Sequence, residues 1–391
     1  MNRLLTWLFG RLPIGWLQLS HSRTRLIAAV AGVAFANLLV FMQLGIMGAL
    51  NNSTMAPYGL LNADIIISSQ EGNTLTDSGS VARAYMFQAL GVPGVVAGTP
   101  LFIGNLPLTL QDGSSIALLA FGIEVAQTGF VAPSIAPDLA RLAIENTVLL
   151  DKNTRGMPKG ALDSLSSGGR YAFEANGKTL NAIGTLAVGG GFLADGMMVT
   201  SDQTFLRFFQ SRSSGAPDHI LLRVADGLSP DTIVERLRAV LPAASVKVQT
   251  AAGAKASDLS FMAVERPTGI IFGFGVFMGV LVGLVIVYQV LSTDVADHLR
   301  EYATFKAMGY AHPFFLGIVF EEALILAVFG FIPGLIVSMG LYTALVAVTG
   351  LPVTMVASRA VLVFVGTLAA CALSGAVATR RLAAADPADL F

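Results

Sequence analysis

The sequence predicts an α-helical membrane protein with four transmembrane helices and a large extracytoplasmic α+β domain between the first and the second helix. Three observations lead to this class. The 391 residues are 54% hydrophobic and only 13% charged, and a soluble domain carries roughly twice that charged fraction. Four predominantly apolar stretches are long enough to cross about 30 Å of hydrocarbon. The block at 51–267 instead mixes charges with strand and turn signals.

The residue types give little support to several classes of function. A net charge of −1 provides no basic surface for nucleic acid. The one cysteine, Cys371, lies in an apolar run, so no disulfide can form within the chain. The four histidines lack the spacing of metal ligands, and no Ser-His-Asp set stands out. We therefore expect no metal site, no catalytic residues and no enzyme activity.

A nucleotide-binding loop is also missing from the sequence. Gly177-Lys178-Thr179 has the ending of a phosphate-binding loop, but Ala172 stands where the first glycine is required. A hairpin turn explains this tripeptide better. We therefore expect that this chain holds no cofactor.

Residues 1–25 are basic and contain no acid. Leucines fall on one side of a helix and Arg3 and Arg11 on another, while Trp7 and Trp16 are rings that settle at the headgroup level. Pro13 and Gly15 are expected to break this helix. The segment predicts an interfacial elbow helix on the cytoplasmic leaflet, in contact with membrane lipids. A plain basic tail is the alternative.

Residues 26–50 carry no charge and form the first predicted transmembrane helix. A signal peptide is the competing interpretation, but its apolar region would be roughly 7–15 residues long and would precede a cleavage site. The run here is longer, and Asn51-Asn52 follows it without such a site. The arginines before it place its start in the cytoplasm by the positive-inside rule.

The block at 51–267 predicts one α+β domain outside the membrane. Asp112-Gly113 and Asn176-Gly177 are hairpin turn signals. Ser229-Pro230 is typical of a helix start. Strands are expected at 63–69, 95–124 (two or three), 146–151, 170–173, 179–186, 197–200, 219–224 and 245–249, and helices at 202–212 and 230–241.

Three more transmembrane helices follow, at 268–293, 314–348 and 360–379. In the first of these, Gly275, Gly279 and Gly283 recur every fourth residue, which permits a close helix contact; glycine is also simply common in membrane helices. Pro333 predicts a kink in the next helix. Four spans put both chain ends in the cytoplasm, so 349–359 is a short outer turn, and 294–313 and the tail at 380–391 lie inside.

The cytoplasmic link at 294–313 carries charge, aromatic rings and a glycine turn within a short length. Val295, Leu299, Tyr302 and Phe305 follow helical spacing and predict one apolar stripe, which Gly309 ends as a cap. A helix lying on lipid would be richer in Lys and Arg. The link therefore predicts a helix held in the groove of a cytoplasmic partner.

Glu321 and Glu322 are the one pair of ionisable residues near the start of a span. Charge within a membrane helix is costly and often functional. The pair could be a coupling element that contacts the link through Arg300 or Lys306. It could equally be a helix-start carboxylate favoured by the helix dipole.

The motifs of this region resemble the FtsX-like permease family of ABC transporters, which includes MacB and LolC/LolE. The resemblance rests on Arg300-Glu301, Lys306, Ala307-Met308-Gly309 and Glu322-Ala323. The fuller strings around them, and Pro13-Ile-Gly-Trp-Leu-Gln-Leu near the start, are similar to the DevC branch. The residues that the link and this resemblance together assign to ATPase coupling are Val295, Asp297, His298, Leu299, Arg300, Glu301, Tyr302, Phe305, Lys306, Gly309 and Glu322.

The resemblance implies a permease in the bacterial inner membrane whose outer domain is periplasmic. It implies a homodimer with two separate ATPase subunits that bind ATP and Mg, a periplasmic membrane-fusion adaptor and a TolC-like outer-membrane duct. Movement of the link helix would be passed to the outer domain, which is called mechanotransmission. The first hypothesis is export of a lipid-like or periplasmic substrate. The alternatives are an FtsX-type relay that activates a cell-wall hydrolase, and a membrane enzyme using Glu321 and Glu322.

Overall fold

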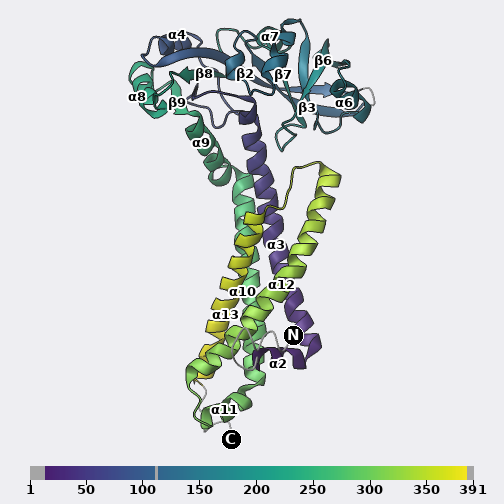
Figure 1. Ribbon diagram of the computed structural model, residues 1–391, viewed down its shortest axis with the longest axis vertical. Coiled ribbons are helices and arrows are strands. Elements are labelled where there is room, and N and C mark those ends of the chain that lie inside the picture. Colours follow the sequence, from purple (N-terminus) through teal and green to yellow (C-terminus); the bar gives the residue numbers. More distant parts are fainter. Residues whose placement is uncertain (1–13, 111–112, 385–391) are drawn as a thin grey trace. The chain divides into compact units, whose positions relative to one another are not determined.

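The structure, a computed structural model, describes residues 14–110 and 113–384 (Figure 1). The chain forms two compact units. The membrane unit comprises Met1–Gly48, Ile270–Val348 and Val353–Phe391, and the outer unit comprises Ala49–Gly269 with Thr349–Pro352. We describe each unit by itself.

The fold class predicted from the sequence is confirmed. Within the described part of the chain, four helices are long and apolar enough to cross a membrane, and a nine-stranded sheet lies in the chain between the first and the second. The candidate spans are Arg23–Leu60, Pro267–Asp297, Pro313–Thr349 and Ala357–Thr379. The helices that contain them are α3 (Arg23–Met55), α10 (Pro267–Asp297), α12 (His312–Thr349) and α13 (Ala357–Ala384).

The helices run further than the apolar stretches that predicted them. Helix α3 continues to Met55, and α12 runs without interruption through Pro333. Helix α10 continues to Asp297, so the first four residues of the predicted link at 294–313 belong to the second span. Hydropathy marks where lipid contact ends, but backbone hydrogen bonding carries a helix past that point.

The first described helix is α2 (Ile14–His21). The elbow helix expected before it lies outside the described residues, so its break at Pro13 and Gly15 stays a prediction. Gly15 itself lies in the first turn of α2. A Cβ atom at this position would lie 2.9 Å from Glu322 Cγ and 3.0 Å from the Ile318 carbonyl oxygen. Glycine is therefore needed here for the close approach of α2 to α12. The predicted features of residues 1–13, including Arg3, Trp7 and Arg11, lie outside the described residues.

The outer unit is built on one mixed sheet with strand order β5-β6-β4-β7-β3-β2-β8-β1-β9. Strands β8 and β9 both pair antiparallel with β1, which lies between them. The strands are β1 (Ile65–Ser69), β2 (Val95–Thr109), β3 (Ser115–Ile123), β4 (Thr147–Asp151), β5 (Tyr171–Ala175), β6 (Lys178–Leu186), β7 (Gly196–Ser201), β8 (His219–Val224) and β9 (Val246–Thr250).

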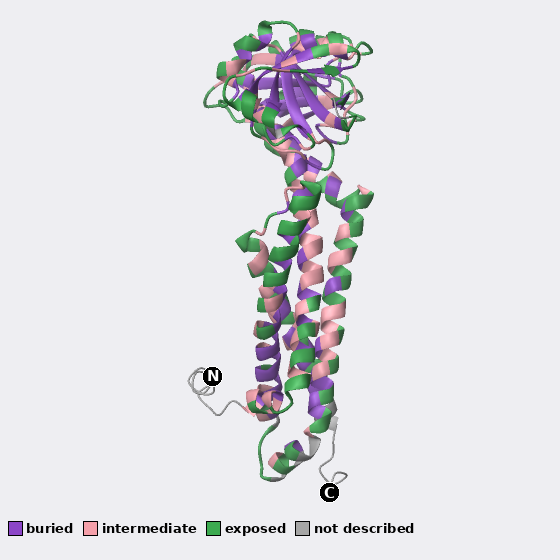
Figure 2. Cartoon of the chain, turned by 90° about the vertical axis from the view of Figure 1, so that its right-hand side faces the viewer, coloured by how far each residue is buried: buried purple, intermediate pink, exposed green. Residues whose placement is uncertain are grey.

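Both faces of this sheet are covered, and the strands show the alternation that this requires. In β1, Ile66 packs in one core cluster and Ile65 and Ile67 in another. In β3, Phe121 packs in one core cluster and its neighbour Ala120 packs in another. Strands inside the sheet are buried (Figure 2), and β4, β7 and β8 are buried almost throughout, whereas the edge strand β5 and the ends of β2 are partly exposed.

Six described helices of the outer unit lie between the strands, or after the last strand, along the sequence. The sequence predicted α7 and α8 but not α4, α6 or α9. Helix α9 did have a start signal, because the Thr250 side chain accepts a hydrogen bond from the Gly253 N–H at its N-cap. The bounds of the six helices are α4 (Ala84–Leu90), α5 (Ala136–Leu139), α6 (Lys159–Ser166), α7 (Asp202–Phe208), α8 (Pro230–Val240) and α9 (Ala251–Val264), with short 3₁₀ turns at Ala56–Leu60, Thr128–Phe130 and Ala140–Ala143.

Two turn predictions can be compared directly with the backbone. Asn176 and Gly177 both have positive φ, 47° and 69°, as a two-residue hairpin between β5 and β6 requires; this prediction is confirmed. Gly113, between β2 and β3, has φ 83°, whereas Asp112 lies outside the described residues. Ser229 takes the helix-cap position of α8, but its hydroxyl makes no capping hydrogen bond.

Candidate functional site

The predicted link is a separate helix set off by a break at His298. Helix α10 ends at Asp297, and α11 (Leu299–Ala307) begins two residues later. His298 has φ −97° and ψ 12°, outside the helical region, and its ring Nδ1 lies 3.0 Å from the Asp294 carbonyl oxygen. The chain therefore changes direction between the second span and the link.

This break corrects the predicted apolar stripe. Val295 belongs to α10, so it does not continue a face of α11. Val295 and Tyr302 are each only 1% exposed and pack into the core of the membrane unit. The two residues hold the link against the bundle, and a partner cannot reach them in this structure. The side chains of Leu299 and Arg300 are not described.

Helix α11 ends in a glycine cap, as predicted. The Gly309 N–H donates to the Lys306 carbonyl at 3.0 Å, and the Tyr310 N–H donates to the Phe305 carbonyl at 3.1 Å. Gly309 has φ +93°, which only glycine adopts freely. This pair of bonds with a ring contact between Phe305 and Tyr310 is a Schellman motif.

Aromatic rings fix α11 to the start of α12. The ring centroids of Tyr302 and Phe315 are 5.7 Å apart and edge-on, and those of Tyr310 and Phe314 are 4.6 Å apart. Phe305 also contacts Phe314 edge-on, at 6.0 Å. Such pairs stabilise by about 0.5–1.5 kcal/mol each beyond area burial, so this hairpin moves as one piece.

Polar contacts tie the same hairpin to the N-terminal helices. The Tyr302 hydroxyl donates to Gln18 Oε1 of α2 at 3.2 Å, and Gln18 Nε2 donates to Glu301 at 3.4 Å. At the base of α3, the Arg25 guanidinium pairs with Asp297 and lies 3.6 Å from Asp294 Oδ1. The link therefore contacts α2 directly, and the end of α10 is joined to α3 by charge.

Three buried carboxyl groups lie at this end of the bundle. Asp294, Glu321 and Glu322 are 1%, 2% and 0% exposed. The Trp16 backbone N–H donates to Glu321 at 3.3 Å. Glu322 lies within hydrogen-bonding reach of Asp294, and without a proton between these two acids Asp294 Oδ2 and both Glu322 oxygens have no donor among the described residues.

The placement of the glutamates corrects one of the two sequence interpretations. Both lie more than two turns beyond His312, the first residue of α12, and both are buried. They are not carboxylates exposed at a helix start. Glu322 has no donor among the described residues unless it shares a proton with Asp294. A buried carboxyl group in this situation is costly, and such a cost is typical of a site that serves function rather than stability.

The Tyr302 phenol lies close enough to the acidic groups for them to affect its pKa. Its phenol is buried, and burial raises its pKa, which the nearby carboxyl groups of Glu322 and Asp294 raise further. The hydroxyl therefore stays protonated and keeps its bond to Gln18. Tyr302 is the residue through which α11 contacts both the acidic groups and α2.

The exposed side of α11 is short. Glu301, Thr304 and Lys306 face outward, and Met308 and Tyr310 after the helix are 61% and 46% exposed. We name these five residues the link face. Of the residues predicted for partner contact, Glu301 and Lys306 lie on it, whereas Phe305 is half-buried.

The glycine stripe of α10 faces α3. A Cβ atom at Gly279 would lie 2.9 Å from Val40 Cγ2, and one at Gly283 would lie 3.2 Å from Ala36 Cβ. A Cβ atom at Gly275 would overlap Gln43. A larger residue at Gly275 or Gly279 would require α3 or its side chains to move.

Sequence reasoning missed Gln18, Arg25 and Asn37 as residues with structural partners. Arg25 and Gln18 were counted only as parts of a basic elbow. Asn37 is an amide inside an uncharged span, and that signal alone marks it, because polar groups in membrane helices usually pair with other helices. It is 5% exposed and accepts a hydrogen bond from Thr367 of α13 at 2.6 Å.

Among the described residues, no group of three or more His, Cys, Asp or Glu side chains is arranged to hold a metal ion. The site therefore consists of a helix–turn–helix with a small exposed face, a packed aromatic interior and a buried acid pair. Such an arrangement can transmit a movement of the link to the neighbouring helices. Its described residues offer no evident nucleophile with an adjacent base.

Comparison with known proteins agrees with the architecture. Residues 273–387 match the family described as FtsX-like permease C-terminal. This segment contains most of α10, the link, α12 and α13. No curated protein matches the chain.

The solved structures similar to the chain each cover about half of it. One is the periplasmic region of MacB from Actinobacillus actinomycetemcomitans, with 12% identity and a TM-score of 0.34, covering 51% of this chain and 94% of that one. Another is the extracellular domain of the noncanonic ABC-type transporter YknZ from Gram-positive bacteria, with 12% identity and a TM-score of 0.32, covering 48% and 98%.

Proposed function

We propose that the chain is the permease subunit of an ABC-type exporter that works by mechanotransmission. The match of residues 273–387 to the family described as FtsX-like permease C-terminal supports a multi-pass membrane protein of the ABC permease kind with an ATPase partner. The role of the link face, the export function and the other partners are our proposal.

The observation that carries the proposal is the two-sided build of α11. Its outer side is the link face, which includes the charged residues Glu301 and Lys306. Its inner side is a packed ring cluster with Tyr302 at its centre. A helix packed firmly on its inner side, with a small exposed outer side, is suited to receive force from a docked ATPase subunit.

Force on α11 would be passed to the neighbouring helices by two routes. Tyr302 bonds to Gln18 of α2, and the aromatic rings join α11 to α12. Arg25 links the end of α10 to the base of α3. Helices α3 and α10 each continue without a break into the outer unit, at Met55 and from Pro267, so a shift at their cytoplasmic ends reaches the outer domain along stiff helices.

The assembly that we propose is a homodimer in the bacterial inner membrane with two ATPase subunits, which bind ATP and Mg. A periplasmic membrane-fusion adaptor and a TolC-like duct would complete the export path, as in the DevC branch. The substrate would be lipid-like or periplasmic. A nine-stranded outer domain provides ample surface for an adaptor to dock.

Co-purification tests the link face. We expect Glu301→Lys combined with Met308→Asp to lower the recovered ATPase subunit at least about tenfold, since it reverses one charge and buries another at a small interface. The matched control is Glu265→Lys with Val264→Asp, the same changes on exposed residues of the outer unit. Unchanged ATPase recovery in the link variant, with a normal melting temperature, would refute the proposal.

A second measurement separates export from signal relay. Purification of the full complex from cross-linked cells should recover a periplasmic adaptor with the wild-type chain. Recovery of a cell-wall hydrolase without an adaptor would favour the relay instead. Neither result depends on the link variants, so the two parts of the proposal can fail separately.

A further inference from the structure

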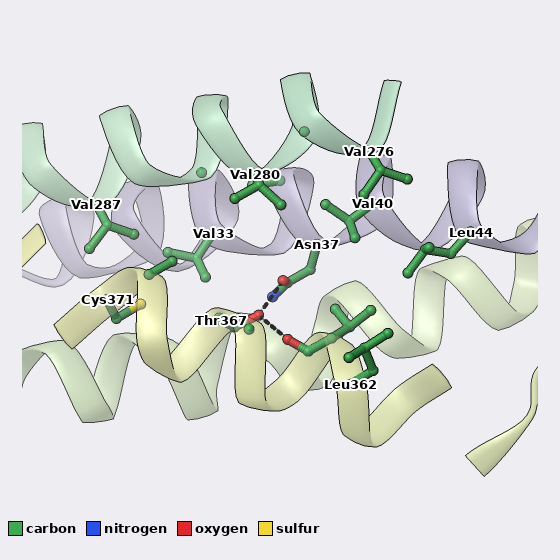
Figure 3. A pocket seen from close by; sticks show the side chains of 16 residues that line it. Val33, Asn37, Val40, Leu44, Val276, Val280, Val287, Leu362, Thr367 and Cys371 are labelled. Atoms are coloured by element: carbon green, nitrogen blue, oxygen red, sulfur yellow. Dashed lines mark hydrogen bonds between the residues drawn. The ribbon is translucent and has the colours of Figure 1, made fainter. Parts of the chain in front are cut away.

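The membrane unit contains an apolar pocket between α3, α10 and α13 (Figure 3). Its volume is about 250 Å³. Val40 and Val280 form its sides, and Gly279 and Gly366 let it reach close to the helix backbones. All its walls come from candidate membrane spans, so it opens where the surroundings are hydrocarbon.

One polar residue faces this pocket without full hydrogen bonding. Asn37 is 5% exposed and lines the pocket, and its Nδ2 has no hydrogen-bond partner among the residues that the structure describes. Figure 3 shows its side chain directed across the pocket toward Thr367. The position lies roughly 20 Å along α3 from Arg23, well inside the membrane.

The bonds drawn around Thr367 cannot all form at once. Its hydroxyl lies 2.6 Å from Asn37 Oδ1 and 2.7 Å from the Val363 carbonyl oxygen, but it has one proton to donate. If the Asn37 amide is turned over, Nδ2 donates to Thr367, and Thr367 donates to Val363. In both orientations at least one N–H of Asn37 has no acceptor among the described residues.

A buried amide N–H in an apolar wall requires an acceptor, because no water is available in hydrocarbon to provide one. The acceptor must arrive on a molecule that is otherwise apolar and narrow. An α-helix, about 10 Å across, cannot enter a pocket of this size. A cavity of about 150 Å³ already holds a benzene-sized molecule, so the larger volume here accommodates a stretch of hydrocarbon chain.

We propose that this pocket binds one hydrocarbon chain of a lipid that carries an oxygen atom along its length, and that Asn37 donates a hydrogen bond to that oxygen. The valines provide the apolar contact, and the glycines allow the chain to lie against the backbone. The site goes beyond the permease function proposed above: it requires no ATPase subunit, so its test can fail while the co-purification test succeeds.

The test compares two probes on the purified full-length chain in detergent: stearate, and hydroxystearate with its hydroxyl at mid-chain. We expect the wild-type chain to bind the hydroxylated probe about five- to tenfold more tightly, as one hydrogen bond predicts. Asn37→Leu should retain binding but remove this preference. Equal affinities of the wild-type chain for both probes would overturn the role of Asn37.

Gly366→Leu tests the pocket itself. Nothing lies within 4 Å of a Cβ atom built at Gly366, so a leucine there fills the pocket without displacing a neighbour, and we expect it to weaken binding of both probes at least tenfold. Gly340→Leu is the matched control, because Gly340 on α12 is equally open and does not line the pocket. Undiminished binding in Gly366→Leu would refute the site, as would a Gly366→Leu chain that loses self-association instead of lipid binding.

Discussion

The outer unit and the membrane unit differ in how they hold buried acidic side chains. In the outer unit each buried aspartate has its donors. Asp218 accepts from the Ile103 N–H at 2.8 Å and pairs with Arg212 at 2.9 Å. Asp258 accepts from the Tyr58 hydroxyl and the Leu75 N–H, both at 2.8 Å. Burial raises the pKa of both carboxyl groups, and the hydrogen bonds oppose this shift.

In the membrane unit, Asp294 and Glu322 face each other instead of facing donors. Arg25 Nη1 lies 3.6 Å from Asp294 Oδ1 and His298 Nδ1 lies 3.6 Å from Asp294 Oδ2, so both described basic side chains approach the pair from the Asp294 side. The difference indicates two purposes. The outer unit uses acids to fix one conformation, whereas the base of the bundle keeps a costly acid pair at the point where α2, α10, α11 and α12 meet.

The largest expected effect lies in the outer unit. Asp218→Ala leaves the Ile103 N–H and Arg212 without their partner, and breaking a buried ion pair in this way costs about 3–5 kcal/mol of folding free energy. Urea unfolding of the full-length protein, followed by hydrogen exchange in β2 and β8, would measure it. Asp226→Ala, at an exposed position, should change stability by less than about 0.5 kcal/mol. Equal effects of the two variants would contradict our account of the outer unit.

Acid should weaken the outer unit through His219. Its Nδ1 lies 2.8 Å from Ser68 Oγ and its Nε2 lies 2.8 Å from the Leu75 carbonyl, and burial lowers its pKa from 6.5 to about 4. Because the folded pKa is the lower one, the unfolded chain takes up the proton first, and stability falls as the pH drops from about 6.5 toward about 4. We expect a loss of about 2 kcal/mol between about pH 7 and about pH 5.

The control for this pH effect is His219→Gln. The raised pKa values of Asp151, Asp218 and Asp258 act with the opposite sign, because the contribution of these carboxyl groups to the free energy of unfolding falls as the pH rises. The difference between the wild-type and His219→Gln profiles isolates the histidine. Parallel profiles would show that His219 does not titrate in this range.

Glu322→Gln should act in the opposite direction to Asp218→Ala. A glutamine amide can donate to Asp294, so we expect the bundle to gain about 1 kcal/mol. ATP hydrolysis by the assembled complex should at the same time become less dependent on substrate, because the acid pair no longer opposes one conformation. Thermal melting in detergent with an ATPase assay checks both. A lower melting temperature would show that the pair stabilises the bundle.

The sequence predicts more of this fold than of the site, and the reasons are physical. Spans and strands depend on local runs of apolar residues, which Ile65–Ile67 and the segment at 268–293 display plainly. The hairpin at Asn176-Gly177 and the cap at Gly309 depend on residues with positive φ, and both were predictable.

The interior of the link was not predictable, because it depends on where a helix breaks. His298 has no strong breaking tendency, so Val295 was assigned to the face of α11 that it does not share. The pairing of Tyr302 with Gln18, and of Arg25 with Asp297, joins residues about 270–285 positions apart. No local pattern records such contacts.

The smallest expected effect compares two glycines in similar conformations, one in each unit. Gly309 has φ +93° and Gly177 has φ +69°, and nothing lies within 4 Å of a Cβ atom built at either. Alanine at each position strains only the backbone, by about 1 kcal/mol. Gly177→Ala should therefore lower only the unfolding free energy of the outer unit. Gly309→Ala should loosen the end of α11. Because Gly309 lies between Met308 and Tyr310 of the link face, this change should reduce ATPase stimulation more than the melting temperature of the variant suggests. Equal stimulation in both variants would show that the cap of α11 serves folding alone.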